Sequence, residues 1–219
     1  MSREVFRNFG RYLVEFFTMD RQMDFDVRLE GSDHLQEAKR PGRGAIVLTG
    51  HLGNWELGAA VIRRMGLPIS VVALEHTDRQ MNRLFHRQRQ RCGIGVISLG
   101  EGAAQQSLAH LREGGILGLL GDQEFGANGI AATLFGQRVT LPRGPAMLSL
   151  RSRAPLVPSF LLRESPQRFR LVFEPPIWPA GVHGSASDPA QPLTCAYAAI
   201  LERYLTHTPT QWLIFRPVN

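Results

Sequence analysis

Hydrophobic and polar positions along the chain follow two different spacings. Short apolar runs, such as residues 45–49 and 116–120, have the length and composition of buried β-strands. Longer segments between them carry apolar residues three or four positions apart, as amphipathic helices do. The pattern predicts strands at residues 24–30, 45–49, 69–74, 94–98, 116–121, 156–162 and 169–173, and helices at residues 5–19, 32–40, 54–65, 78–92, 102–112, 142–153 and 193–206.

Regular alternation of strands and helices is typical of one fold class. It predicts an α/β fold with a mainly parallel central sheet flanked by helices on both faces. No domain boundary interrupts the pattern, so we expect a single domain over residues 1–219 that begins with an amphipathic helix at about residues 3–19. Ligands of such sheets bind beyond the carboxyl ends of the strands, and we expect the functional residues there.

The first predicted helix has an aromatic side and a basic side. Its apolar positions are Phe6, Phe9, Leu13, Phe16 and Phe17, and its basic positions are Arg3, Arg7 and Arg11. Packing against the rest of the domain explains this pattern, and so does a helix that lies on a membrane surface, since basic amphipathic helices with Phe on the apolar face bind there. Both interpretations stay open.

Composition and apolar run length exclude several protein classes. The chain is 43% hydrophobic and 20% charged, ordinary proportions for a globular protein. No apolar run approaches the ~18 to 20 residues that cross a bilayer, and no secretory signal is visible, so we expect a cytoplasmic chain without a spanning segment. The two cysteines, Cys92 and Cys195, lack metal-ligand spacing, and we expect neither a disulfide framework nor a metal site.

The formal net charge of +6 comes from arginine. Arginine provides 24 of the 25 basic residues, and Lys39 is the one lysine. Lys39 lies in a polar loop next to Arg40 and Pro41, which excludes a Walker A loop and Schiff-base catalysis. Guanidinium groups favour anionic partners. No aromatic RNA-binding strand or basic recognition helix accompanies the charge, and we expect no nucleic acid partner.

The strongest chemical signal is the segment Thr49-Gly50-His51-Leu52-Gly53-Asn54-Trp55-Glu56, which follows the first buried strand. His51 lies at the carboxyl end of a strand, and Glu56 lies in the first turns of the next helix. A carboxylate on one ring nitrogen fixes the tautomer and raises the basicity of the other nitrogen, as a general base requires. Gly50 and Gly53 allow a substrate close to the backbone, and the N–H groups of the helix can stabilise developing negative charge. Acyl transfer would use both features.

This segment resembles the GHxGNWE block of the lipid A biosynthesis lauroyl and myristoyl acyltransferase family, which is similar to the glycerolipid acyltransferases with their HX4D motif. The resemblance continues in order to about Trp212. The further blocks are Gly121-Asp122-Gln123, Leu134-Phe135-Gly136, Pro142-Arg143-Gly144-Pro145-Ala146, Ala154-Pro155-Leu156-Val157-Pro158 and Gln211-Trp212-Leu213.

The resemblance implies a glycerolipid acyltransferase-like fold and an O-acyltransferase without a cofactor. His51, activated by Glu56, would take the proton of a lipid or glycolipid hydroxyl that attacks an acyl thioester, with acyl carrier protein or acyl-CoA as the donor. No covalent acyl-enzyme is required, and the chain has no GxSxG nucleophile elbow. Six further residues are candidates for substrate binding: Gly53, Asn54, Asp122, Gln123, Arg138 and Arg143.

Asp122 ends a predicted strand, which places it on the same edge as His51 if the sheet is parallel. There its carboxylate would orient an arginine or the acceptor, or else cap a loop. Arg138 and Arg143 could hold a phosphate of the acceptor or of the carrier's phosphopantetheine, or lie in solvent.

Arginines at every fourth position form a basic stripe on the predicted helix 78–92: Arg79, Arg83, Arg87 and Arg91. A solvated face and a docking surface for acidic carrier protein or anionic lipid both explain it. We expect peripheral contact with the inner face of the cell membrane. A thioester or ester hydrolase with the same His51 and Glu56 pair, and a non-catalytic lipid- or carrier-binding module, are the alternative functions.

Overall fold

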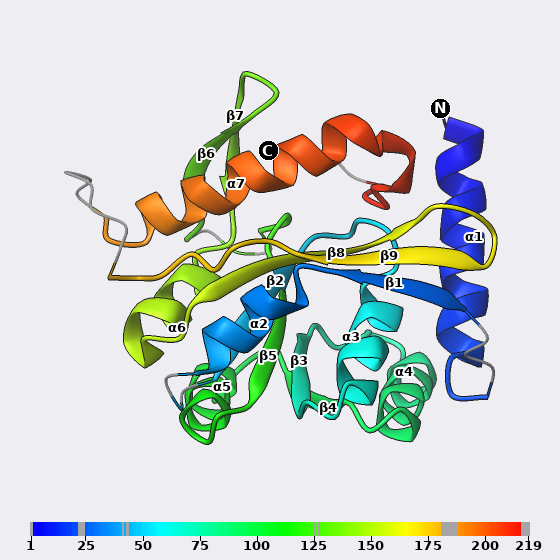
Figure 1. Cartoon of the computed structure of the whole chain (residues 1–219), viewed down its shortest axis with the longest axis horizontal. Helices are drawn as coiled ribbons and strands as arrows, with labels where there is room; N and C mark the ends of the chain where they lie inside the picture. The colour runs from blue at the N-terminus through cyan, green and yellow to red at the C-terminus, as the bar shows by residue number, and fades with distance from the viewer. Residues whose placement is uncertain are drawn as a thin grey trace.

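A seven-stranded sheet runs through the centre of the molecule, with helices on both sides (Figure 1). The computed structural model describes residues 2–21, 25–40, 42, 44–124, 126, 128–180 and 188–215. The strands of the sheet are β1 (Asp26–Glu30), β2 (Ala45–Thr49), β3 (Ile69–Ala73), β4 (Gly95–Ser98), β5 (Ile116–Leu120), β8 (Leu156–Arg163) and β9 (Arg168–Phe173).

The strand order is β1-β9-β8-β2-β5-β3-β4. The five strands from β8 to β4 are parallel to one another, β9 is antiparallel to β8, and β1 is parallel to β9. The mainly parallel α/β fold expected from the sequence is therefore confirmed.

Seven α-helices and one 3-10 helix lie in the described part of the chain. They are α1 (Ser2–Thr18), α2 (Ser32–Lys39), α3 (Trp55–Arg64), α4 (Arg79–Arg91), α5 (Ala103–Arg112), α6 (Gly144–Ser152), α7 (Gln191–His207) and η1 (Pro209–Gln211). Each α-helix overlaps one that the hydrophobic pattern predicts. None of the helices in the described residues is both long and apolar enough to cross a membrane.

A hairpin of β6 (Ile130–Leu134) and β7 (Gln137–Leu141) is missing from the predicted elements. It projects from the sheet beside α7 (Figure 1). Its alternate residues Ile130, Ala132 and Leu134 are buried in the same cluster as the inner side of α7. This two-residue period is a strand signal, but the run is short and lies within a stretch rich in glycine.

Two hydrophobic clusters cover the two faces of the sheet, and successive residues of one strand enter different clusters. In β2, Ile46 and Leu48 belong to the cluster under α5, α6 and α7, while Ala45 and Val47 belong to the cluster under α1 to α4. Because both faces are covered, the strand has to be apolar throughout, which explains the unbroken apolar run in the sequence.

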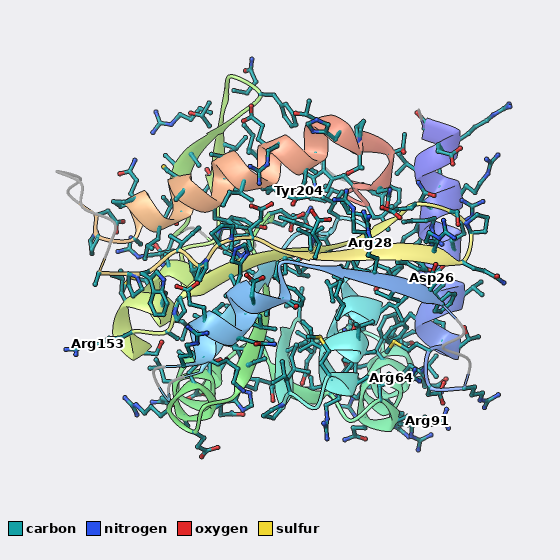
Figure 2. All side chains as sticks on the ribbon, viewed as in Figure 1. Asp26, Arg28, Arg64, Arg91, Arg153 and Tyr204 are labelled. Carbon is teal, nitrogen blue, oxygen red and sulfur yellow. The ribbon has the colours of Figure 1, made fainter. Side chains whose placement is uncertain are left out.

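Helix α7 packs across the sheet through aromatic contacts. Tyr204, labelled on the sheet side of α7 in Figure 2, lies with its ring centroid 4.4 Å from that of Phe160 in β8. The Tyr204 hydroxyl donates a hydrogen bond to Glu174. Burial, together with that carboxylate, raises the pKa of Tyr204, so the hydroxyl keeps its proton.

Helix α1 is packed on the domain along one side and exposed along another. Asn8, Tyr12, Glu15 and Phe16 are buried. Phe6 is 64% exposed, on the same helix. The interpretation as a packed helix therefore holds for one side of α1, while Phe6 on another side is exposed to solvent.

Candidate active site

The register of two neighbouring strands brings His51 and Asp122 together. Strands β2 and β5 are parallel, and Thr49 at the end of β2 pairs with Leu120 at the end of β5. His51 and Asp122 each lie two residues beyond these partners, so they meet at the carboxyl edge of the sheet. Asp122 thus lies on the edge where a parallel sheet predicts it.

Two hydrogen bonds join His51 to the Asp122 carboxylate. The ring Nδ1 of His51 lies 2.9 Å from Oδ1, and the backbone N–H of His51 donates to Oδ2 at 2.7 Å. A carboxylate on Nδ1 makes Nδ1 the protonated nitrogen, so Nε2 carries the lone pair that can accept a proton. The side chain of Asp122 is 0% exposed, which keeps water from competing for these bonds.

Glu56 contacts a different partner from the one expected. In the described structure its carboxylate accepts hydrogen bonds from Arg89 in α4, from Nε at 3.1 Å and from Nη2 at 2.5 Å. From the first turn of α3 the side chain lies in the cluster between α3 and α4, where a buried carboxylate requires a counter-charge. The predicted contact from Glu56 to the His51 ring is therefore replaced by the contact from Asp122.

A third buried group joins this ion pair. Burial, and then the nearby Glu56 charge, raise the pKa of Tyr12 well above its ordinary value, so Tyr12 is neutral. Burial alone would lower the pKa of Arg89, but the Glu56 carboxylate outweighs it and the pKa is raised. The cluster therefore contains one fixed ion pair and one neutral phenol.

The His51 side chain forms part of the lining of an apolar cavity of about 280 Å³. Its walls come mainly from β2, β3, β5, α3 and α4, with residues of β8, β9 and α1, and the polar cluster of Glu56, Arg89 and Tyr12 forms part of the lining. The apolar lining residues include Val47, Ala59, Ile62, Ile69, Val71, Phe85, Leu119 and Leu161. Such a space suits a hydrocarbon chain, and the imidazole is within reach of it.

The Trp55 ring lies beside His51 at the start of α3. Its centroid is 5.0 Å from that of the imidazole, in an edge-to-face arrangement, and the ring also stacks on Tyr12 at 4.4 Å. These contacts limit the positions that the His51 ring can take. Sequence reasoning gave Trp55 no role, although it lies within the motif.

The two glycines of the motif accommodate parts of the chain itself. A Cβ at Gly50 would lie 3.0 Å from Oδ2 of Asp122, and a Cβ at Gly53 would lie 1.9 Å from the carbonyl oxygen of Leu161 in β8. Gly53 also has a φ of +68°, which disfavours other residues. The groups that lie close to Gly50 and Gly53 are therefore Asp122 and β8, where the sequence predicts a substrate.

Asn54 is the N-cap of α3. Its Oδ1 accepts a hydrogen bond from the N–H of Leu57 at 3.0 Å, and its Nδ2 donates to Glu15 of α1 at 2.9 Å. The N–H of Asn54 donates to Leu161, and that of Gly53 donates to Gln211. These N–H groups are occupied within the chain, so stabilisation of an oxyanion would have to come from other groups.

The remaining predicted binding residues lie away from the cavity lining. Gln123 follows Asp122 and is half-buried, Arg138 is exposed on β7, and Arg143 forms an ion pair with Asp188 just before α7. The structure therefore places His51 and Glu56 in the cavity lining, with Asp122 bound to His51, and leaves the two arginines at other places on the surface.

Sequence reasoning also missed the contact from Trp212. Its indole Nε1 donates to Oδ2 of Asp122 at 3.0 Å, across a separation of 90 residues. The Gln211-Trp212-Leu213 block was the signal that pointed to this segment, without a role for the tryptophan.

Comparison with known proteins gives a consistent group of relatives. The model of a family described as "Bacterial lipid A biosynthesis acyltransferase" matches residues 1–218. A phosphatidylinositol mannoside acyltransferase of Mycolicibacterium smegmatis is 26% identical over 99% of this chain and 71% of its own length. A lipid A biosynthesis palmitoleoyltransferase of Escherichia coli is 28% identical over 97% of this chain and 69% of its own length.

A shorter match is found in Mycobacterium tuberculosis. There a phosphatidylinositol mannoside acyltransferase is 28% identical over 69% of this chain, a region that spans 51% of the relative.

Proposed function

Since the chain belongs to the bacterial lipid A biosynthesis acyltransferase family, we propose that it transfers a fatty acyl group from an acyl thioester to a hydroxyl of a lipid or glycolipid acceptor. One observation carries this proposal: a histidine oriented by a buried carboxylate forms part of the lining of an apolar cavity. That arrangement provides a base for the hydroxyl and a space for the acyl chain.

In the proposed reaction, Asp122 keeps the proton of His51 on Nδ1, and Nε2 accepts the proton of the acceptor hydroxyl. The hydroxyl oxygen attacks the thioester carbonyl, the carbon–sulfur bond breaks, and the thiolate takes the proton from the imidazolium. The products are an ester and a free thiol. General-base assistance supplies a factor of about 10² to 10⁴, and positioning of the two substrates adds to it.

The acyl chain of the donor would lie in the cavity. Each buried CH₂ group is worth about 0.8 kcal/mol, so the apolar wall holds the chain strongly enough to fix the carbonyl next to His51. In this proposal Glu56 supports catalysis from the wall of the cavity: its ion pair with Arg89 holds α3 against α4.

The donor is acyl carrier protein or acyl-CoA, and both are anionic. On α4, Phe85 and Arg89 line the cavity, while the stripe Arg79, Arg83, Arg87 and Arg91 is exposed. Arg91, which Figure 2 labels at the lower edge of the molecule beside α4, pairs with Asp20. One helix thus presents positive charge outside and a hydrophobic wall inside, which supports entry of the donor over α4.

Sugar-bearing lipids are the proposed acceptor class, because the relatives act on phosphatidylinositol mannosides and lipid A by their names. Arg138 is exposed on the hairpin and could contact an acceptor phosphate, as its sequence position suggested. Arg143 already pairs with Asp188 and would have to exchange that partner.

Peripheral contact with the inner face of the cell membrane would bring the enzyme to its acceptor. Phe215, near the end of the described chain, stacks on Phe6 of α1 and meets Phe9 of the same helix edge to face, and we call these three residues the aromatic patch. Phe6 and Phe215 are 64% and 52% exposed, and Arg3 and Arg7 lie exposed on the same helix. Apolar rings with cations alongside suit an anionic lipid surface.

The proposal is tested by incubation of the protein with radiolabelled palmitoyl-CoA or palmitoyl acyl carrier protein, each with and without vesicles that contain phosphatidylinositol mannoside or a lipid A precursor. Labelled acceptor lipid that depends on His51 is the expected result. Label released only as free fatty acid, at equal rates with and without acceptor, would identify a hydrolase. Intact donor in every arm would favour a binding module.

A further inference from the structure

The carboxylate that orients His51 is itself held by a tryptophan from the other end of the chain. Oδ2 of Asp122 accepts two hydrogen bonds, one from the backbone N–H of His51 at 2.7 Å and one from the Trp212 indole at 3.0 Å. Oδ1 is then directed at the His51 ring. A carboxylate pinned at one oxygen by two donors has little freedom to rotate about its Cβ–Cγ bond.

Backbone hydrogen bonds tie the tryptophan to the loop that carries the histidine. Leu213 donates its N–H to the carbonyl of His51 at 2.7 Å, and Gly53 donates to the carbonyl of Gln211 at 3.0 Å. Leu52 and Trp212 form an isolated antiparallel bridge between these two bonds. His51 and Trp212 therefore share one short ladder, and both contact the same carboxylate from it.

The far side of residues 208–213 is anchored to β8 and α1. The Gln211 side chain bonds both backbone groups of Arg163, accepting from N at 2.8 Å and donating to O at 2.9 Å. Asn8 of α1 donates to the carbonyl of Thr210 at 2.9 Å. These contacts fix the segment independently of Asp122, so the indole can act as a fixed donor.

We propose that Trp212 is a positioning residue for acyl transfer: its indole N–H fixes the Asp122 carboxylate, and the carboxylate thereby holds the His51 ring in its productive orientation. This inference rests on the proposed function of His51 as the general base. Trp212 does not contact the substrate in this scheme. Its effect reaches the reaction through Asp122.

The competing explanation for Trp212 is packing, since its ring lies half-buried against the cluster under α7. The two explanations differ in the atom that matters. Packing requires the shape of the indole, whereas positioning requires its N–H. A substitution that removes the N–H and keeps the shape separates them.

The experiment replaces Trp212 in the full chain with 3-benzothienylalanine, a tryptophan analogue with sulfur in place of N–H, by stop-codon suppression. The same replacement at Trp178, a half-buried tryptophan after β9, is the matched control. Tryptophan restored at position 212 by the same method is the rescue. Trp212→Phe is a second variant that needs no analogue. The probe is palmitoyl-CoA with phosphatidylinositol mannoside vesicles, or whichever donor and acceptor the wild-type chain uses.

We expect the analogue at position 212 to lower kcat roughly 10- to 100-fold, because a hydrogen bond to a charged group is lost from the catalytic pair. KM for the donor should change less than about twofold, since the cavity is untouched. The low-field proton resonance of His51 Nδ1–H, assigned by its loss in His51→Ala, should shift or broaden. The control at Trp178 should leave all three measurements unchanged.

Two patterns would overturn the inference and point to different errors. Wild-type kcat with the analogue at 212, together with an inactive His51→Ala, means that Trp212 only packs and the proposed base stands. If His51→Ala keeps its activity, His51 is not the general base, and Trp212 then has no positioning role either.

Discussion

Arg89 in α4 donates hydrogen bonds to both carboxylate oxygens of Glu56 in α3, and both side chains are almost fully buried. Removal of one member of a buried ion pair leaves the other charge without compensation. The contact therefore makes the stability of the α3–α4 packing depend on Glu56.

We predict that Glu56→Gln lowers the free energy of unfolding by about 3 kcal/mol, the cost of one uncompensated buried charge. Chemical denaturation checks this value. Arg91→Gln is the matched control: Arg91 lies on the same helix with a 56% exposed side chain and pairs with Asp20 at 3.6 Å, so its loss should change stability by less than about 1 kcal/mol. If Glu56→Gln loses activity while its stability is unchanged, Glu56 takes a direct part in the reaction and its structural role is not the explanation.

His51→Ala should remove most of the acyl transfer activity and leave the fold intact. The ring contributes the proposed base, and its removal should reduce the rate by a factor of about 10² to 10⁴. Initial rates and thermal unfolding check the two halves of the statement. His86→Ala, on the partly buried side of α4, is the control and should keep its rate.

Asp122→Asn should reduce kcat by about 10³-fold or more while the chain stays folded. The amide keeps the size of the carboxylate but loses the charge that stabilises the imidazolium. Its NH₂ group also cannot accept a hydrogen bond, whereas one oxygen of Asp122 accepts from the His51 ring and the other from Trp212. Comparison of kcat with that of Glu56→Gln identifies the carboxylate of the pair. If Glu56→Gln loses more of kcat at equal folded fraction, the assignment of Asp122 is wrong.

The elements of the sheet could be predicted because a strand covered on both faces is apolar throughout. Residues 45–49 form β2 with the expected bounds for that reason. Strand order lies outside such patterns: β3 and β4 come between β2 and β5 in sequence, yet β2 and β5 are neighbours. The partner of His51 depends on that neighbourhood, so local spacing favours Glu56, five residues away, over Asp122.

Glycine in a motif has a similar ambiguity. The sequence indicates that another group lies close to the Gly50 backbone but does not identify that group. In the structure it is the Asp122 carboxylate. The contact between Trp212 and Asp122 also lies outside local patterns, because the ladder that brings them together joins segments about 160 residues apart, near His51 and near Leu213.

Gly50→Ala should lower kcat about tenfold with a small effect on stability. The new Cβ would lie 3.0 Å from Oδ2 and 3.1 Å from Cγ of Asp122, so the carboxylate must shift by a few tenths of an ångström, and misplacement of catalytic groups is costly. Gly10→Ala, where a Cβ meets nothing within 4 Å, is the matched control. Full kcat in Gly50→Ala would mean that the pair tolerates displacement.

The aromatic patch provides the test of membrane contact. Phe16, on the packed side of α1, is fully buried, so its substitution would unfold the protein rather than report on lipid. Phe6 and Phe215 stack at 5.4 Å and are largely exposed, so a double change to serine removes apolar surface at little expense to the core.

We expect wild-type protein to sediment with anionic vesicles and Phe6→Ser with Phe215→Ser to bind at least about tenfold more weakly, because a buried aromatic ring is worth about 1.5 to 3 kcal/mol. Binding should also fall as salt rises, since the contribution of Arg3 and Arg7 is screened within about 8 to 10 Å at physiological ionic strength. Phe135→Ser, an exposed aromatic on the β6–β7 hairpin, is the control. If Phe135→Ser loses vesicle binding and Phe6→Ser with Phe215→Ser keeps it, the hairpin rather than α1 faces the lipid. The acceptor would then reach His51 from the side of α7.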